Sequence, residues 1–298
     1  MKHLLDIESL SAEDARRILI RAAEMKKLRG PHPDAPLRGE CWALMFSKSS
    51  TRTRLSFEVG IRELGGQPVF LAANDIQLGR GEPIRDTARV MGRMVQGAVI
   101  RTYAQGDVEE FAELSGVRTI NALTDEEHPC QILSDLFTIT EKRGGLDGLV
   151  LTFIGDGDCN MARSWIWAAA RLGFELRIAS PAKFQPPAEF VARAGGKVTV
   201  TTDVLAASAG ADVLYTDVWI SMGKEDEAAF RTAQFAGYQI NRAAVDAAGG
   251  SPLVMHCLPA YRGKEITEDV FEGNAQTIFD QAENRLHAQK AVLTLLEK

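Results

Sequence analysis

The chain has 298 residues, of which 45% are hydrophobic and 25% are charged, and its formal net charge is -6. At roughly 150 residues per domain this length predicts two domains, and the composition excludes a disordered, collagen-like or coiled-coil protein. The negative net charge, without a block of basic residues, argues against duplex nucleic acid and anionic membranes as partners.

The cysteines and the N-terminal segment indicate a reducing compartment. Cys41, Cys130, Cys159 and Cys257 lie far apart and form no CxxC pair, so the sequence predicts neither a zinc site nor a disulfide framework. The segment MKHLLDIESL carries acidic residues and lacks the long apolar run of a secretory signal. Nowhere do 18 consecutive apolar residues occur, so we expect a cytoplasmic protein without a membrane span.

In the first half of the chain, short apolar runs alternate with amphipathic stretches. In chain order we expect helix 11–28, strand 41–46, helix 52–64, strand 68–72, helix 84–94, strand 97–101, helix 107–115, strand 118–123 and helix 130–143. This alternation predicts a parallel sheet with helices on both faces.

The second half repeats the alternation after a break rich in glycine. Gly144, Gly145 and Gly148 separate helix 130–143 from the next strand, and we place the domain boundary there, with four strands before it and at least five after it. The elements expected beyond it are strand 149–155, helix 161–172, strands 175–180, 197–201 and 212–216, helix 225–235, strand 253–258 and helix 283–297.

The segment FSKSSTRTRLSFEVG, residues 46–60, passes from a strand through a polar loop into a helix. Hydroxyl groups and two arginines therefore stand where a helix N-terminus leaves backbone N–H groups unpaired, which is how proteins hold phosphate. The alternative is an ordinary Ser/Thr cap followed by two solvated arginines. Because Arg52 and Arg54 alternate with threonine directly at the cap, we favour an anion site.

The segment His128-Pro129-Cys130-Gln131 follows strand 118–123 and opens a helix, so it lies at the carboxyl edge of the sheet. A histidine and a glutamine three residues apart can both point at a carbonyl or an amide. A His-Pro pair at a helix start is usually structural. Its occurrence beside the arginine-rich loop favours a role in binding.

Three strand ends of the second half carry polar groups. The turn GDGDC before Asn160 lacks the third glycine of a dinucleotide fingerprint and its two aspartates would repel a pyrophosphate, so we interpret it as a ligand-facing turn with Asn160 as a contact. Asp217 could hold a cationic group or be a solvated turn residue. Cys257 could be a small core residue or, near a carboxylate, help to position or deprotonate a nucleophile.

Taken together, these segments resemble the transcarbamylase family, and within it the ornithine branch. FSKSSTRT matches the carbamoyl-phosphate signature, and HPCQ matches the HPxQ element. Ser221-Met222-Gly223 matches the SMG loop of the ornithine branch, and His256-Cys257-Leu258-Pro259 matches its HCLP motif, where the aspartate branch would carry HPLPR. The resemblance covers nearly the whole chain.

The resemblance implies an α/β fold of two doubly wound domains, each a central parallel sheet flanked by helices, joined by interdomain helices. Residues 1–143 would bind carbamoyl phosphate, with the C-terminal helix 283–298 packing back on them, and residues 144–282 would bind ornithine. It also implies a homotrimer, or a multiple of trimers, that needs no metal and no cofactor.

Site residues are carried over position by position. The carbamoyl-phosphate contacts would be Ser50, Thr51, Arg52, Thr53, Gln77, Arg101, His128, Gln131, the backbone at Cys257 and Leu258, and Arg285 at the start of the last predicted helix. The ornithine contacts would be Asn160, Asp217, Ser221 and Met222. The turn GDGDC stands where the family often has asparagines, which leaves Asp158 and Cys159 without an expected contact.

The implied reaction transfers the carbamoyl group of carbamoyl phosphate to the δ-amine of L-ornithine, giving L-citrulline and phosphate, in arginine metabolism. Asp217 and Cys257 would orient the amine and help to remove its proton, while Thr53, Arg101 and His128 would stabilise the charge that develops on the carbonyl oxygen. Within the family, aspartate, putrescine or an N-acylated ornithine are competing substrates. Outside it, the alternatives are a nicotinamide-dependent oxidoreductase and a non-catalytic phosphate- or amino-acid-binding module.

Overall fold

The computed structural model describes residues 1–72, 81–221 and 223–297. The chain divides into two compact units, the first made of Met1–Phe137 with Glu283–Lys298 and the second of Thr138–Ala282. Within the described residues, no helix combines the length and the apolar composition that crossing a bilayer requires.

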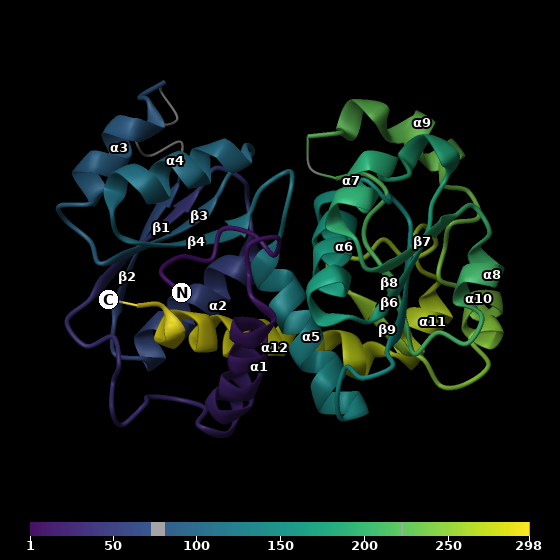
Figure 1. Cartoon of the computed structure of the whole chain (residues 1–298), viewed down its shortest axis with the longest axis horizontal. Coiled ribbons are helices and arrows are strands. Elements are labelled where there is room, and N and C mark those ends of the chain that lie inside the picture. Colours follow the sequence, from purple (N-terminus) through teal and green to yellow (C-terminus); the bar gives the residue numbers. More distant parts are fainter. Residues whose placement is uncertain (73–80, 222, 298) are drawn as a thin grey trace. The chain divides into compact units, whose positions relative to one another are not determined.

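The first unit is built on a four-stranded parallel sheet with helices on both faces (Figure 1). Its strands are β1 (Cys41–Phe46), β2 (Gln67–Ala72), β3 (Gly97–Arg101) and β4 (Arg118–Leu123), in the order β2-β1-β3-β4. Its own helices are α1 (Ala12–Lys27), α2 (Thr51–Glu63), α3 (Ile84–Met91) and α4 (Gln105–Ser115). Alternate residues of β1, such as Ala43 and Met45, pack against α3 and α4, as the two-residue period of a strand requires.

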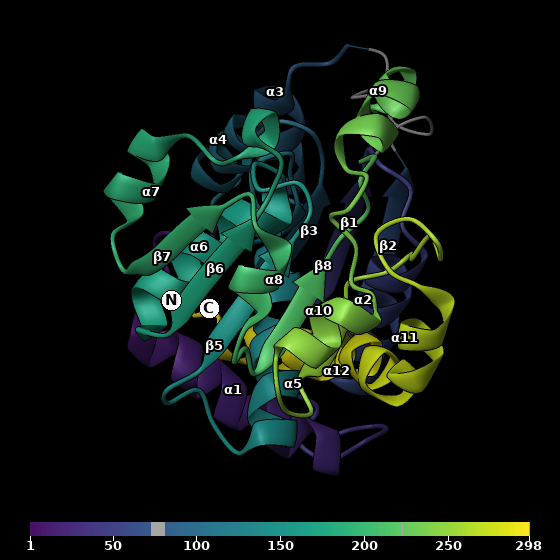
Figure 2. The same ribbon diagram turned by 90° about the vertical axis from the view of Figure 1, so that its right-hand side faces the viewer.

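The second unit is built on a five-stranded parallel sheet, in the order β7-β6-β5-β8-β9. The strands are β5 (Val150–Ile154), β6 (Glu175–Ala179), β7 (Lys197–Thr201), β8 (Val213–Thr216) and β9 (Leu253–His256). Figure 2 shows β7, β6, β5 and β8 side by side, with α8 (Val204–Ser208) and α10 (Arg242–Ala247) on one face. On that face Ile154, Leu214 and Val254 form the core with residues of these helices and of α11 (Glu268–Gly273).

The other face of the second sheet is covered mainly by α6 (Asn160–Leu172), with α7 (Ala188–Ala194) beside it. Trp165 of α6 packs edge-on against Tyr215 of β8, with ring centroids 5.3 Å apart, and Phe153 of β5 stacks on the same tyrosine. Two further helices, α5 (Pro129–Arg143) and α12 (Ala275–Leu295), each run from one unit into the other.

The fold class expected from the sequence is confirmed, and all nine predicted strands are present. Two helix predictions need correction. The stretch predicted as helix 225–235 begins as a 3₁₀ turn, Glu225–Glu227, before α9 (Ala228–Gln234). The last helix begins at Ala275 rather than at residue 283, so Arg285 lies well inside α12 and not in its first turn.

The helices that the sequence analysis missed are short. α7, α8, α10 and α11 have seven residues or fewer, as does the 3₁₀ turn Ala182–Phe184. A helix of two turns or less is too short to display a 3.6-residue hydrophobic period, so packing against the sheet determines it rather than local pattern.

Candidate active-site residues in the two units

In the first unit the predicted phosphate-binding residues lie at the switch point of the sheet. β1 is followed by β2 on one side, and the chain then returns to place β3 on the other side of β1. Ligands of doubly wound folds bind where the strand order reverses, at the carboxyl ends of the strands. Ser50 to Thr53 follow β1, and Arg101 is the last residue of β3, so both stand at this position.

The first turn of α2 combines an N-cap with an anion-binding sequence. Ser50 is the N-cap, and its hydroxyl accepts a hydrogen bond from the Thr53 N–H at 3.3 Å. The N–H groups of Thr51 and Arg52 belong to the first turn, which has no intrahelical acceptors, and the positive end of the helix dipole adds to their attraction for an anion. The cap and the anion site are therefore features of the same turn.

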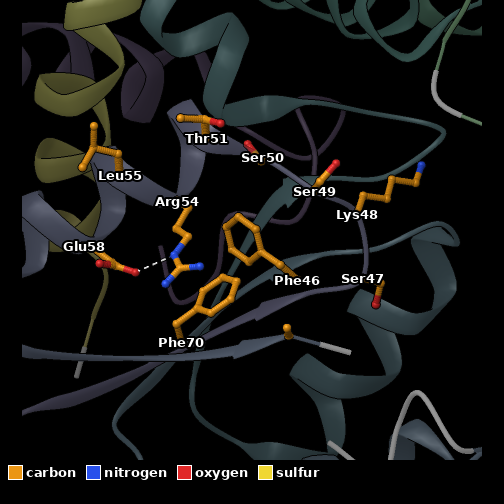
Figure 3. A pocket seen from close by; sticks show the side chains of 11 residues that line it. Phe46, Ser47, Lys48, Ser49, Ser50, Thr51, Arg54, Leu55, Glu58 and Phe70 are labelled. Atoms are coloured by element: carbon orange, nitrogen blue, oxygen red, sulfur yellow. Dashed lines mark hydrogen bonds and ion pairs between the residues drawn. The ribbon is translucent and has the colours of Figure 1, made fainter. Parts of the chain in front are cut away.

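A pocket of about 600 Å³ opens beside this turn, lined by the loop after β1, the start of α2 and strand β2 (Figure 3). Within it Arg54 pairs with Glu58 at 2.8 Å and lies over the ring of Phe70, 3.5 Å from its centroid. Arg54 is therefore held by its own helix and by β2. Lys48, which the sequence analysis did not select, pairs with Asp125 after β4.

A buried chain of hydrogen bonds joins three of the predicted residues. Arg285 Nη1 donates to Thr53 Oγ1 at 3.3 Å, and Arg285 Nη2 donates to Gln131 Oε1. Gln131 Nε2 in turn donates to Asp135 Oδ1 at 2.6 Å. Residues from α2, α5 and α12 thus meet in one cluster, although they are far apart in the sequence.

Helix α12 is fixed against α2 by a second buried contact, which sets the place of Arg285. Lys290 Nζ lies 2.6 Å from a carboxylate oxygen of Glu63, and both side chains are buried. Gly60 allows this approach, because a Cβ atom there would lie only 3.2 Å from Lys290 Cγ. The close contact between the two helices brings Arg285 within reach of Thr53.

His128 is a buried, neutral imidazole at the start of α5. Desolvation lowers its pKa well below the ordinary value of 6.5, and the positive charges of Arg285 and Arg101 lower it further. A neutral ring can donate one N–H hydrogen bond without giving up a proton to a weakly basic oxygen. Arg101, also buried, lies at a shift of register between β3 and β4, an irregularity that can re-aim a side chain.

In the second unit, the strand order reverses between β5 and β8, and the predicted residues again follow the strands at that position. Asn160 is the first residue of α6 after β5, Asp217 follows β8, and Cys257 follows β9. Cys257 Sγ donates to Asp217 Oδ1 at 3.0 Å, and the Val218 N–H donates to the same oxygen at 2.7 Å. The sequence-based suggestion of a carboxylate near Cys257 therefore agrees with this geometry.

The residues flanking Cys257 are held by a buried histidine and glutamate. The Leu258 N–H donates to His256 Nδ1 at 2.9 Å, so the ring hydrogen is on Nε2, which lies 3.1 Å from Glu265 Oε1. Leu258 has a positive φ of 61°, and the Leu258–Pro259 peptide bond is cis. Asp217, His256 and Cys257 offer possible metal-ligand atoms within 4.8 Å of one another, but both ring nitrogens of His256 are occupied by these hydrogen bonds.

The turn GDGDC uses its polar residues for local structure. Cys159 is the N-cap of α6, accepting from the Ala162 N–H, and burial together with Asp156 and Asp217 raises the pKa of its thiol well above the usual value. Asp158 pairs with Arg163 at 2.9 Å, and Asp156 pairs with Arg231 at 2.7 Å. Ser221 is half-buried in the loop after β8, and Gln77 and Met222 lie outside the described residues.

Two family models match consecutive parts of the chain. Residues 2–141 match the model described as "Aspartate/ornithine carbamoyltransferase, carbamoyl-P binding domain", and residues 147–296 match "Aspartate/ornithine carbamoyltransferase, Asp/Orn binding domain". The chain belongs to the aspartate/ornithine carbamoyltransferase family. The resemblance inferred from the motifs is thereby confirmed.

Relatives of this family match over nearly their whole length. The chain is 57% identical to ornithine carbamoyltransferase of Akkermansia muciniphila, covering 99% of this chain and 98% of the relative. It is 50% identical to the anabolic ornithine carbamoyltransferase of Pseudomonas aeruginosa, covering 99% and 97%. The crystal structure of the anabolic enzyme of Campylobacter jejuni matches with a TM-score of 0.93 at 41% identity, covering 99% of both chains.

The sequence analysis did not select three residues of these regions. They are Lys48, which lines the pocket with Ser50 and Thr51, Asp135, which is bonded to Gln131, and Glu265, which is bonded to His256 next to Cys257. Lys48 lies inside the signature loop and could have been found there. Asp135 lies four residues after Gln131 on a predicted helix, a spacing that places two side chains on one face. Glu265 follows a loop after β9, and the sequence gives no signal for its contact with His256.

Proposed function

We propose that this chain is a carbamoyltransferase that transfers the carbamoyl group of carbamoyl phosphate to the δ-amine of L-ornithine, giving L-citrulline and phosphate in arginine metabolism. The observation that carries the choice of ornithine is the contact of Cys257 with Asp217 at the carboxyl ends of β9 and β8. A carboxylate in this position suits a substrate that brings an amino group and opposes one that brings a second carboxylate.

Carbamoyl phosphate is bound by the first unit in this proposal. Its phosphate dianion meets the N–H groups at the start of α2, the hydroxyls of Ser50, Thr51 and Thr53, and the guanidinium of Arg52. Arg285, which donates to Thr53, and Arg101 complete the positive surroundings. Gln77 matches a further contact of the family. Gln131 belongs to the proposed set as the residue that addresses the amide of the carbamoyl group.

The carbonyl group is activated by hydrogen bonds rather than by proton transfer. As the amine attacks, negative charge develops on the carbonyl oxygen, and preorganised donors stabilise it. Neutral His128 supplies an N–H donor, and Thr53 and Arg101 supply a hydroxyl and a positive charge. The low pKa of His128 supports this role, because the ring stays neutral at physiological pH.

Ornithine is bound by the second unit in this proposal, with Asn160, Asp217, Ser221 and Met222 as its contacts. An alkyl amine has a pKa near ~10.4, by analogy with lysine, so the attacking δ-amine must first lose a proton. Asp217 and Cys257 orient the amine and assist that loss. The backbone at Cys257 and Leu258 accepts hydrogen bonds from the carbamoyl amino group, and the His256–Glu265 contact that holds this backbone supports the assignment.

We propose the following domain organisation and assembly, of which the trimer rests on the family resemblance alone. Residues 1–143 with the C-terminal helix form the carbamoyl-phosphate domain, residues 144–282 form the ornithine domain, and the chain assembles as a cytoplasmic homotrimer. Light scattering of the purified protein tests the assembly, and a stable, active monomer would refute it.

The proposed activity is tested by incubating the purified protein with carbamoyl phosphate and L-ornithine and measuring citrulline and phosphate together. Equal amounts of the two products, formed in proportion to enzyme, are expected. Binding of phosphate and ornithine without turnover would instead identify a binding module, and ornithine-dependent reduction of a nicotinamide cofactor would identify an oxidoreductase.

A further inference from the structure

We infer that Asp135 is a positioning residue that fixes the side-chain amide of Gln131, so that its oxygen is presented to the amino group of carbamoyl phosphate. The inference rests on the proposed function and extends it to a residue that does not itself touch substrate. It explains how the site would distinguish a carbamoyl group from an acyl group of the same shape.

The contact between the two residues is short and fully buried. Asp135 and Gln131 both have side chains with 0% exposure, and Gln131 Nε2 lies 2.6 Å from Asp135 Oδ1. They are four residues apart on α5, so the helix itself aligns them. A buried carboxylate is costly unless it accepts hydrogen bonds, so a donor facing Asp135 is strongly preferred.

The pairing with Asp135 helps to decide in which direction the oxygen of the Gln131 side-chain amide points. The oxygen and nitrogen ends of a glutamine amide have nearly the same shape, and only their partners decide which way the group points. An ionised carboxylate can accept but cannot donate, so the NH₂ end turns to Asp135. The oxygen end is then directed to the opposite side, where Arg285 Nη2 donates to it.

This orientation places an acceptor in the anion-binding cluster. Arg285 also donates to Thr53 in the first turns of α2, so the Gln131 oxygen lies in the same hydrogen-bonded cluster as the predicted phosphate contacts. Arg285, with five N–H donors, can keep one bond to this oxygen while an incoming amino group supplies another, since a carbonyl oxygen has two lone pairs. A carbamoyl NH₂ group supplies that donor, whereas the methyl group of acetyl phosphate does not.

The expected consequence is selectivity between carbamoyl phosphate and acetyl phosphate. Sites built to hydrogen-bond a group reject analogues that lack it far more strongly than sites that merely exclude by size. Without Asp135 the amide is held from one side only, by Arg285, so its oxygen is presented less precisely and this selectivity should fall. Binding of the phosphate group, which depends on the start of α2, should change little.

The test compares the wild type with Asp135→Leu and with the isosteric Asp135→Asn. Three constants are measured: the KM of carbamoyl phosphate, and the inhibition constants of acetyl phosphate and inorganic phosphate. The selectivity ratio is the inhibition constant of acetyl phosphate divided by the KM of carbamoyl phosphate. For Asp135→Leu we expect this ratio to fall by about tenfold or more, as loss of one buried hydrogen bond implies. Asp135→Asn should give an intermediate fall, because asparagine can still accept through its oxygen.

The chain offers a matched control on α12. Gln276 and Asp280 form the same i, i+4 pair with the same donor and acceptor atoms at 2.7 Å, outside the buried cluster, and Asp280 also pairs with Lys142 at 2.6 Å. Asp280→Asn should leave the selectivity ratio unchanged. A double mutant with Gln131→Ala completes the cycle, and in that background Asp135→Asn should have no further effect on the ratio.

Equal changes in all three constants, or additive effects of the two substitutions, would overturn the inference and leave Asp135 a structural residue. Should Asp135→Leu fail to fold, Asp135→Asn and the cycle decide the question alone. If the wild type forms no citrulline at all, the proposed function fails before the role of Asp135 is reached, so the two failures are distinguishable.

Discussion

The two units share an architecture but differ in the chemistry at equivalent places. In each, a parallel sheet reverses its strand order, at β1 and β3 in the first unit and at β5 and β8 in the second, and the candidate residues follow those strands. The first unit carries arginines and a neutral histidine there, and the second carries a carboxylate and a thiol. The fold supplies the location, and the loops after the strands supply the chemistry.

The units also differ in how the candidate residues are held. In the first, side chains from three helices reach one another, so Thr53, Gln131 and Arg285 depend on the packing of α2, α5 and α12. In the second, Asp217 and Cys257 follow neighbouring strands, and the backbone of the loop after β9 is held locally by His256 and Glu265. Substitutions in the first unit should therefore act on carbamoyl phosphate, and those in the second on the amine substrate.

The largest effect is expected from Arg52→Ala, which removes a cation from the start of α2. A charge-assisted hydrogen bond of this kind contributes roughly 1.5–3 kcal/mol, so kcat/KM for carbamoyl phosphate should fall by at least about tenfold. Arg54→Ala is the control, because Arg54 is partly exposed and already paired with Glu58. Steady-state kinetics and a thermal unfolding curve of both variants make the comparison, and equal kinetics in Arg52→Ala and the wild type would contradict the phosphate assignment.

The next largest effect concerns the second unit. Asp217→Asn removes the negative charge beside Cys257 but keeps the shape of the side chain. We expect kcat/KM for ornithine to fall by about tenfold or more, consistent with loss of a hydrogen bond to a charged group, while the KM of carbamoyl phosphate stays within a few-fold. A larger change in the KM of carbamoyl phosphate than in kcat/KM for ornithine would contradict the assignment of the two substrates to separate units.

A pH dependence of stability should distinguish the first unit. Because the folded-state pKa of His128 lies well below 6.5, the unfolded chain binds a proton at pH values where the folded chain does not. The free energy of unfolding should therefore be fully present above about pH 6.5 and should decrease as the pH falls below it, by up to about 1.4 kcal/mol per pH unit from this residue. Denaturant unfolding from pH 7.5 to 5 should show a shallower slope for His128→Gln, and parallel slopes would disprove the assignment.

The smallest effect is expected from Asp158→Ala in the turn before α6. Asp158 pairs with Arg163 in a partly exposed salt bridge, and such pairs contribute about 1 kcal/mol or less. Stability should change only slightly, and the KM of ornithine should stay as in the wild type. In contrast, Asn160→Ala, two residues further on, should raise that KM, and the reverse order of effects would move the ornithine contact to Asp158.

Much of this arrangement could be predicted from the sequence, because its signals are local. Buried strands give apolar runs. The segment FSKSSTRT begins at the last residue of one such run, and the element HPCQ follows another after four residues. The side-chain contacts could not be predicted in the same way. The meeting of Arg285 with Gln131, and of Glu265 with His256, depends on how helices and loops pack, which no local pattern records.

The start of α12 is a further feature that the sequence pattern did not predict correctly. The helix was predicted to begin at residue 283, eight residues later than its actual start at Ala275. Residues 286–293, which the prediction included, are all buried and display no amphipathic stripe. Cys130 is a further residue whose structural role the sequence pattern does not reveal. The sequence places it inside a binding element, but its thiol donates to the Asn121 carbonyl and burial raises its pKa to about 12, so it acts as a core residue.

The central claim is that the second unit selects ornithine for carbamoylation by the first. It is tested most directly by measuring kcat/KM at saturating carbamoyl phosphate for L-ornithine, N-acetylornithine, putrescine and L-aspartate. We expect ornithine to exceed each of the others by a large factor, because putrescine lacks the carboxylate, N-acetylation removes a positive charge, and aspartate brings a negative charge toward Asp217. An equal or higher value for any of the three would contradict the assignment of ornithine, even though the chain would remain a member of its family.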